Sequence, residues 1–183
     1  MSSSNKYILI NGLIKIAEFL VDSFATLYIL SKGASYTQLG IMWTLYLGII
    51  AVTDYPTGGF ADKFGRKKIY TYGVILTAIS YYLMLSPHTL VLYISYMVKG
   101  VATSLISGSL TAWLACDLKD SEIFKDTVAK SSLVSNVICF VLPIIVLLFV
   151  NINMDIVFIV SASIHLVVGI IVIRFLEENY GSQ

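Results

Sequence analysis

The chain has 183 residues and a formal net charge of +1, and 57% of its residues are hydrophobic whereas only 13% are charged. Soluble domains carry about 25% charged residues. The composition therefore excludes an ordinary soluble fold and indicates a protein whose surroundings are lipid. The net charge by itself favours no class of partner, but the distribution of the charges along the chain is informative.

Six apolar segments are expected to cross a bilayer as helices, because a helix satisfies its own backbone groups in lipid and about 20 residues span the hydrocarbon core. Their approximate ranges are 7–30, 38–61, 69–85, 90–116, 128–150 and 156–175. Turn-forming residues separate some of these segments, as at Ser86-Pro87, and charged loops separate the others. The prediction is an all-α, polytopic membrane protein in which residues 1–183 form a single six-helix domain.

Lysine and arginine residues fall almost entirely on one side of the expected topology. The nine on that side are Lys6, Lys63, Arg66, Lys67, Lys68, Lys119, Lys125, Lys130 and Arg174. The opposite side has only Lys32. Short loops rich in lysine and arginine stay in the cytoplasm. Both termini are therefore predicted to be cytoplasmic, in a multi-pass protein of the cell membrane.

The first apolar segment contains Lys15, Glu18 and Asp22, at a spacing that places them on one helical face. Ionisable residues inside a membrane are costly and usually face a partner or a polar cavity. This face is expected to point into the bundle, as a structural charge cluster or as the lining of a solute pathway. Asp22 is the candidate proton carrier, because Lys15 can compensate Glu18 more easily than Asp22. The same charges, with no cleavage site after them, argue against a removable signal peptide.

Two further ionisable residues lie inside expected spans. Lys99, near the middle of the fourth span, is expected to pair with Glu18 or Asp22, either as a structural salt bridge or within a pathway. Asp54 lies close to Pro56, which removes a backbone donor, and is expected to be a buried acid bonded to freed backbone groups or to a lysine. The candidate pathway residues are Glu18, Asp22, Asp54 and Lys99.

The fourth span carries small residues at four-residue steps, namely Gly100, Ser104, Gly108 and Ala112. Small residues on one helical face predict the close approach of a neighbouring helix. Trp113 is expected to anchor the end of this span at the membrane interface, in preference to a ligand contact.

Metal, cofactor and enzyme chemistry are not indicated. His88 and His165 each lack a second ligand at helical spacing, so no metal site is expected, and Cys116 and Cys139 are expected to be free thiols. The sequence has no nucleophile elbow, phosphate-binding loop or paired-carboxylate signature, so it predicts no catalytic residues and no cofactor. The aromatic residues are scattered through the spans, so no nucleic-acid partner is expected.

The segment 58–68 carries the most specific motif of the chain and reads GGFADKFGRKK. It resembles the signature of the major facilitator superfamily, G-x-x-x-D-(R/K)-x-G-(R/K)-(R/K), and falls in the same loop, between the second and third spans. Residues 54–58 resemble the acidic-x-Pro-Thr-Gly end of the second helix in that family. Residues 107–113 and Asp117 are similar to the end of the fourth helix in drug-efflux-like members, although Thr111 stands where those members often have glutamate.

The resemblance implies the fold of an N-terminal six-helix half, built as a 3+3 inverted repeat, and transport by alternating access. It implies that Gly58 permits close helix contact, that Gly65 makes a tight turn, and that Asp62 caps or opposes a helix end across the two halves. Arg66 is expected to pair with Asp117. The alternative is that the basic residues of the loop only enforce topology. The implied switch residues are Gly58, Asp62, Gly65, Arg66, Lys67 and Asp117.

The chain has the length of one half, whereas members of the family normally have two six-helix halves with the solute path between them. The resemblance therefore implies a half-transporter in the lipid bilayer that moves a small solute, by efflux coupled to protons. Its partner would be a second six-helix half, either another copy or a separate chain, covering Glu18, Asp22 and Lys99. The alternative is a fragment, a non-transporting remnant or an assembly partner of another six-helix unit.

Overall fold

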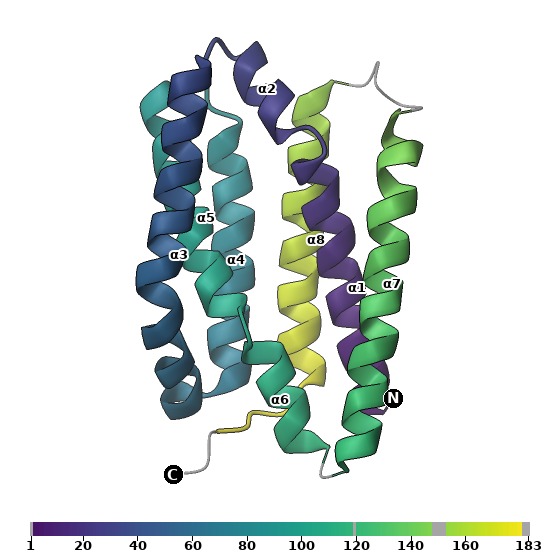
Figure 1. Cartoon of the computed structure of the whole chain (residues 1–183). Coiled ribbons are helices and arrows are strands. Elements are labelled where there is room, and N and C mark those ends of the chain that lie inside the picture. Colours follow the sequence, from purple (N-terminus) through teal and green to yellow (C-terminus); the bar gives the residue numbers. More distant parts are fainter. Residues whose placement is uncertain (1, 119, 148–152, 181–183) are drawn as a thin grey trace.

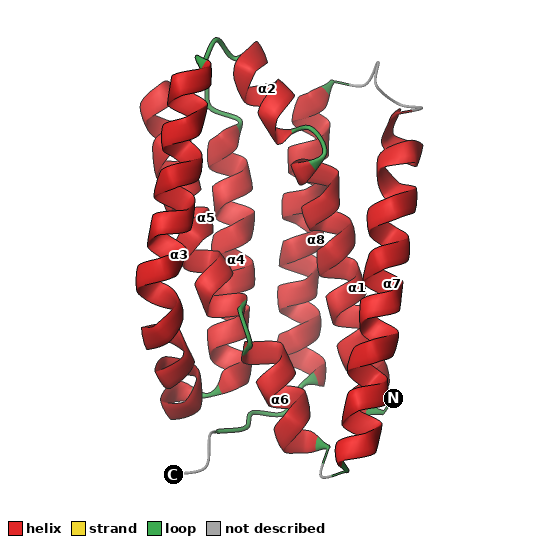
Figure 2. Ribbon diagram, in the orientation of Figure 1, coloured by secondary structure: helices red, strands yellow, loops and turns green. Residues whose placement is uncertain are grey.

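The computed structural model of the chain describes residues 2–118, 120–147 and 153–180, and the elements in this part are helices. Their bounds are α1 Ser3–Asp22, α2 Ala25–Ser31, α3 Tyr36–Phe64, α4 Arg66–Met84, α5 Thr89–Ile106, α6 Ser109–Asp117, α7 Ser121–Leu147 and α8 Met154–Phe175. The longer helices stand alongside one another in an upright bundle (Figure 1 and Figure 2). The prediction of an all-helical protein is confirmed for the described residues.

Four helical stretches within the described residues are long and apolar enough to cross a membrane, and they are Tyr36–Phe64, Thr89–Asp117, Ser121–Val146 and Met154–Phe175. The other long helices are less apolar, because charged residues lie along α1 and three basic residues begin α4. Such stretches indicate a multi-pass membrane protein. The count of six spans and the internal repeat stay predictions, and the expected end of the fifth span lies outside the described residues.

The expected ranges 7–30 and 90–116 each contain two helices in place of one, α1 with α2 and α5 with α6. At the first break, the Ser23 hydroxyl donates to the Phe19 carbonyl at 2.6 Å. Such a bond gives the backbone an alternative to the helical ladder. At the second break, Gly108 has a φ of +71°, a left-handed conformation that glycine adopts without strain.

Hydroxyl groups bond backbone carbonyls next to the α5–α6 break. The Ser109 hydroxyl donates to the Leu105 carbonyl at 2.7 Å, and the Thr57 hydroxyl of α3 donates to the Ser104 carbonyl at 3.0 Å. Unpaired backbone groups are expensive in lipid, so a break within a span needs such partners. The Thr57 hydrogen bond therefore joins α3 to the end of α5, beside the α5–α6 break.

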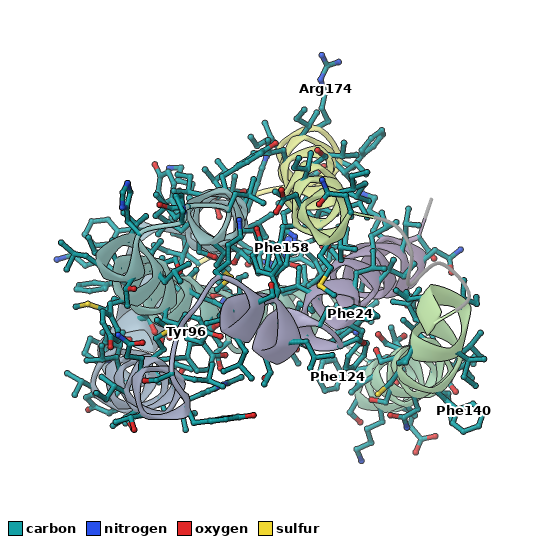
Figure 3. The ribbon with its side chains drawn as sticks, turned by 90° about the horizontal axis from the view of Figure 1, so that it is seen from above. Phe24, Tyr96, Phe124, Phe140, Phe158 and Arg174 are labelled. Atoms are coloured by element: carbon teal, nitrogen blue, oxygen red, sulfur yellow. The ribbon has the colours of Figure 1, made fainter. Side chains whose placement is uncertain are left out.

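The bundle consists of two groups of helices that meet where α4 packs on α8. One group is α3, α4 and α5, and the other is α1, α7 and α8 (Figure 1). The core nearer α2 includes Tyr28, Tyr81 and Phe158, and the core nearer the opposite end includes Tyr70 and Trp113. Seen along the bundle, Phe158 lies near the centre, between the two groups (Figure 3).

Glycines set two close helix contacts. A Cβ atom at Gly100 of α5 would lie 2.9 Å from the carbonyl oxygen of Tyr46 in α3, and one at Gly73 of α4 would lie 2.7 Å from Ile106 in α5. The expected role of Gly100 in close packing is confirmed. A Cβ at Gly108 would meet nothing within 4 Å among the described atoms, so this glycine serves the break in the helix and not a helix contact.

α7 is attached along α1. The Asn11 amide donates to the Ser131 hydroxyl at 2.7 Å, and the Thr127 hydroxyl donates to that of Ser4 at 2.9 Å. Most other described side chains of α7 are exposed or half-buried. In lipid, helices associate through packing and hydrogen bonds and not through the hydrophobic effect. These polar contacts are therefore important for holding α7 in place.

The start of α1, the α3–α4 turn and the end of α8 lie at the same end of the bundle, called the loop end below (Figure 1). The basic residues of the predicted cytoplasmic side lie at or near this end, except that Lys119 is outside the described residues. Lys32 lies at the opposite end, where its ammonium is 3.5 Å from the Asp155 carboxylate. This distribution agrees with the charge pattern of the sequence, and the assignment of the loop end to the cytoplasm stays a prediction.

Candidate functional site

A polar hollow lies between α1, α3, α4 and α5. It has a volume of about 190 Å³ and is lined by Lys15, Glu18, Asp22, Tyr46, Thr77, Tyr81, Lys99 and Thr103. The charged face of α1 thus points into the bundle, as its spacing predicts. The lining contains two lysines and two carboxylates, so its formal charge is zero.

An ion pair in this hollow joins α1 to α5. Lys99 Nζ lies 3.0 Å from Asp22 Oδ1, so the expected pairing of Lys99 with an acid of the first span is confirmed. The Lys99 side chain is 11% exposed, and its ammonium lies 5.7 and 5.4 Å from the ring centres of Tyr46 and Tyr81. Aromatic faces attract a cation at this range. The Asp22 side chain is 45% exposed, so the carboxylate is the accessible member of the pair.

The second ion pair of the hollow lies within α1, where Lys15 Nζ is 2.6 Å from Glu18 Oε2. Lys15 therefore compensates the charge of Glu18, as predicted, and Asp22 forms its ion pair with Lys99. Each pair can exchange one of its members for a group of a bound solute. Neutralisation of Asp22 by a proton would also release the Lys99 ammonium, because the two charges hold each other.

Three buried polar groups on α4 and α8 have no hydrogen-bond partner among the described residues, and two of them, the Tyr81 hydroxyl and His165 Nε2, belong to neighbouring rings; the third is the Ser161 hydroxyl. The two rings meet edge to face, with centres 5.3 Å apart. His165 Nδ1 lies 2.8 Å from the Ser161 carbonyl, which assigns the proton to Nδ1 and makes Nε2 an acceptor. Buried polar groups normally have partners, so Tyr81, which lines the hollow, has an unused hydroxyl donor. Its position beside the hollow could not be predicted, because it is one of 12 tyrosines.

Asp54 is exposed on α3 and does not line the hollow, so the expectation of a buried acid was wrong. α3 is apolar nearly all round, and its sequence therefore does not indicate which face is buried. Gly58 and Gly59 are exposed as well, and a Cβ at either would meet nothing within 4 Å among the described atoms. The close helix contact expected of Gly58 is absent from the described part of the chain.

The signature loop forms the sharp turn between α3 and α4. Gly65 has a φ of +107°, so the expected tight turn is confirmed. The Arg66 guanidinium donates to Asp62 Oδ1 from Nε at 3.1 Å and from Nη2 at 2.7 Å. Its Nη1 reaches α6, where it donates to the Ala112 carbonyl at 2.8 Å and to Cys116 Sγ at 2.6 Å. Arg66 therefore joins the turn to α6.

The expected pair between Arg66 and Asp117 was wrong. Among the described residues, Arg66 is paired with Asp62, and Asp117 is exposed at the end of α6. Successive residues of a helix point about 100° apart. Arg66 therefore meets Ala112 and Cys116, which share one face of α6, and not the neighbouring Asp117.

Trp113 is buried, with 2% exposure, and its Nε1 donates to the Glu177 carbonyl at 2.8 Å. The expectation of an interfacial anchor was therefore wrong, because this side chain belongs to the core of the loop end. Cys116 and Cys139 are free thiols, as expected. No group of three or more potential metal ligands occurs within the described residues.

Comparison with known families decides the class of the protein. Residues 8–182 match the sequence model of the Major Facilitator Superfamily. The chain belongs to the major facilitator superfamily. Members of this superfamily are membrane transporters and not enzymes, and the resemblance carried by residues 58–68 is confirmed at the level of the family. No curated protein matches the chain.

In this member of the superfamily, the candidate residues fall into two groups and a remainder. The group in the hollow consists of Glu18, Asp22 and Lys99. The group in the signature loop consists of Asp62, Gly65, Arg66 and Lys67. The remainder, Asp54, Gly58 and Asp117, is exposed on α3 and α6.

Proposed function

We propose that the chain is one half of a secondary active transporter, which moves a small solute across the membrane by alternating access. The observation that carries the proposal is the Lys99–Asp22 ion pair beside an open hollow between otherwise apolar helices. Ionisable residues inside a membrane are expensive and often mark a solute or ion pathway. A purely structural ion pair needs neither a hollow beside it nor a carboxylate that is 45% exposed.

A second six-helix unit would cover surfaces that the described chain leaves open. These are the Asp22 carboxylate, the α3 face around Asp54 and Gly58, and the Asp62 side chain, which is 55% exposed. Small residues suit the close approach of a neighbouring helix, and a carboxylate suits a helix N-terminus. The second unit is another copy of the chain or a separate protein, and it meets this chain along α3.

Asp22 carries the coupling proton in this proposal. Protonation of Asp22 removes the negative charge that holds the Lys99 ammonium, so the pair opens and the ammonium turns to the solute. Loss of the proton restores the pair and releases the solute. The cycle links proton entry to efflux of a drug-like or metabolite solute, because each turnover needs one protonation of Asp22 and one deprotonation.

Flux in proteoliposomes tests the proposal. The probe is ethidium with an imposed pH gradient, and the protein is the chain alone or together with a separately encoded second half. We expect gradient-dependent flux in the wild type and its loss in Asp22→Asn, which cannot take up a proton. The control is Asp126→Asn, which removes an exposed ion pair with Lys130 and should leave flux unchanged.

Two outcomes would count against the proposal. Undiminished gradient-dependent flux in Asp22→Asn would contradict the role of Asp22 as proton carrier. Absence of gradient-dependent flux from every preparation would favour a membrane protein that does not transport.

A further inference from the structure

The residues after α8, Leu176–Tyr180, run across the loop end and are called the strap below. In Figure 1 the strap leaves the end of α8 and passes beside α6 toward the lower ends of α3 and α4. Leu176 is buried in the same core as Trp113 and anchors the strap. The rest of the strap is polar and forms no regular element, so its course depends on the groups that it bonds.

The strap bonds α6 at three points. Trp113 Nε1 donates to the Glu177 carbonyl at 2.8 Å, and the Asn179 amide donates to the Trp113 carbonyl at 2.9 Å. Cys116 Sγ lies 3.9 Å from the Tyr180 carbonyl. The two bonds that involve Trp113, one from its buried indole and one to its backbone carbonyl, fix the strap along α6.

The strap also bonds the signature loop. The Arg66 backbone N–H donates to the Asn179 carbonyl at 3.1 Å, and the Lys67 backbone N–H donates to Glu178 Oε1 at 2.9 Å. The N-cap residue of α4 is Gly65, which has no side chain to bond the first N–H groups of the helix. A carboxylate at this position satisfies one of those groups and is attracted by the helix dipole. Glu178 therefore caps the N-terminus of α4, although it is distant from this helix in the sequence.

Two structural features favour glycine at position 65 of the signature loop. Its φ of +107° is strained for any other residue. In addition, a Cβ atom at Gly65 would lie 2.5 Å from Cδ and from Oε1 of Glu178. The second reason exists only because the Glu178 carboxylate fills the space beside the turn.

We propose that Glu178 is a positioning residue of the transporter, which holds the signature loop, the strap and α6 together as one unit. Arg66 completes this unit, because its backbone bonds the strap while its side chain bonds Asp62 and α6. Release of Glu178 would loosen the strap beside α6, which continues from α5 through the Ser107-Gly108 break. The inference stands on contacts at the loop end and does not require the proposed solute pathway.

Thiol alkylation of the full-length chain in lipid nanodiscs tests this positioning role. The sequence has two cysteines, so Cys139→Ser leaves Cys116, beside the strap, as the single thiol. Cys116 is exposed, but its Sγ contacts Arg66 Nη1 and the Tyr180 carbonyl of the strap. We expect Glu178→Ala to raise the rate at which a bulky maleimide alkylates Cys116 by roughly tenfold, because the loss of a charge-assisted hydrogen bond releases these contacts. Glu178→Gln keeps an oxygen acceptor and should show a smaller rise.

Two controls separate this effect from general loosening. Glu177→Ala removes the adjacent carboxylate, but Glu177 bonds Trp113 through its backbone carbonyl, so Cys116 should react as in the parent. In the reciprocal Cys116→Ser background, Cys139 on α7 should react at the same rate with and without Glu178→Ala. Equal Cys116 rates in Glu178→Ala and Glu177→Ala would overturn the proposal, as would a parallel rise at Cys139.

Gly65→Ala gives an independent measurement that does not alter the charge. The added methyl group should push the Glu178 carboxylate away and raise the alkylation of Cys116 as Glu178→Ala does. In the double variant the two effects should be less than additive, because the methyl group no longer meets the carboxylate and only the strain of the turn remains. Full additivity of the two rate increases would overturn the proposal.

Discussion

Asp22→Asn is expected to lower the melting temperature of the purified chain by about 4–8 °C, because it leaves the buried Lys99 ammonium without a charged partner. Removing one member of a buried ion pair costs about 3–5 kcal/mol. The partial exposure of Asp22 reduces this to about 2 kcal/mol, and each kcal/mol corresponds to about 2–4 °C in a chain of this length. Thermal unfolding in a mild detergent, followed by far-UV circular dichroism, measures the shift.

A double variant and a matched acid make this prediction specific. Asp22→Asn with Lys99→Met removes both charges and should recover most of the lost stability, because no unpaired ammonium remains. Glu18→Gln removes the acid of the other pair, whose lysine is 34% exposed and can be hydrated, so the decrease should be smaller. The prediction fails if Glu18→Gln and Asp22→Asn lower the melting temperature equally, or if the double variant is less stable than each single variant.

Gly100→Ala is expected to destabilise the chain by about 1–3 kcal/mol, the usual range for overpacking a close contact. The new methyl group would lie 2.9 Å from the Tyr46 carbonyl oxygen and 3.0 Å from Cγ2 of Ile49, so α5 must move away from α3. The shift would also carry Lys99, the preceding residue, away from Asp22. Thermal unfolding under the same conditions measures the loss of stability.

Gly48→Ala is the matched control, because it makes the same chemical change inside α3, where a Cβ would meet nothing within 4 Å among the described atoms. Alanine favours a helix over glycine by up to about 1 kcal/mol. The control should therefore melt at the parent temperature or above it. A loss of stability in Gly48→Ala as large as that in Gly100→Ala would show that helix contact is not the cause.

The grouping of charges in the hollow could be predicted, because ionisable residues in apolar helices face the interior of the bundle and pair with one another. Lys99 needs an anion, and Glu18 and Asp22 lie on one face of the first helix, so their meeting follows from composition and helical spacing. The sequence left both acids open as the partner of Lys99, and in the structure Lys99 pairs with Asp22 whereas Lys15 compensates Glu18. The tight turn at Gly65 was predictable for a similar reason, because few residues fit such a conformation.

Other features of the site depend on details that helical periodicity does not contain. The partner of Arg66 is set by rotation about α6, where a shift of one residue exchanges Cys116 for Asp117. The exposure of Asp54 was missed because lipid-facing and protein-facing sides of an apolar helix have similar compositions. The strap could not be predicted at all, because its bonds come from residues that are distant in the sequence.

α7 has a consequence for how the protein must be handled outside its membrane. Apolar contacts along this helix can be replaced by detergent tails at little change in free energy, since the tails are equally apolar. The Asn11–Ser131 hydrogen bond has no such substitute. A solubilising agent that competes for these polar groups would detach α7 and uncover α1, which carries Glu18 and Asp22. The choice of detergent therefore bears directly on the charged face of the hollow.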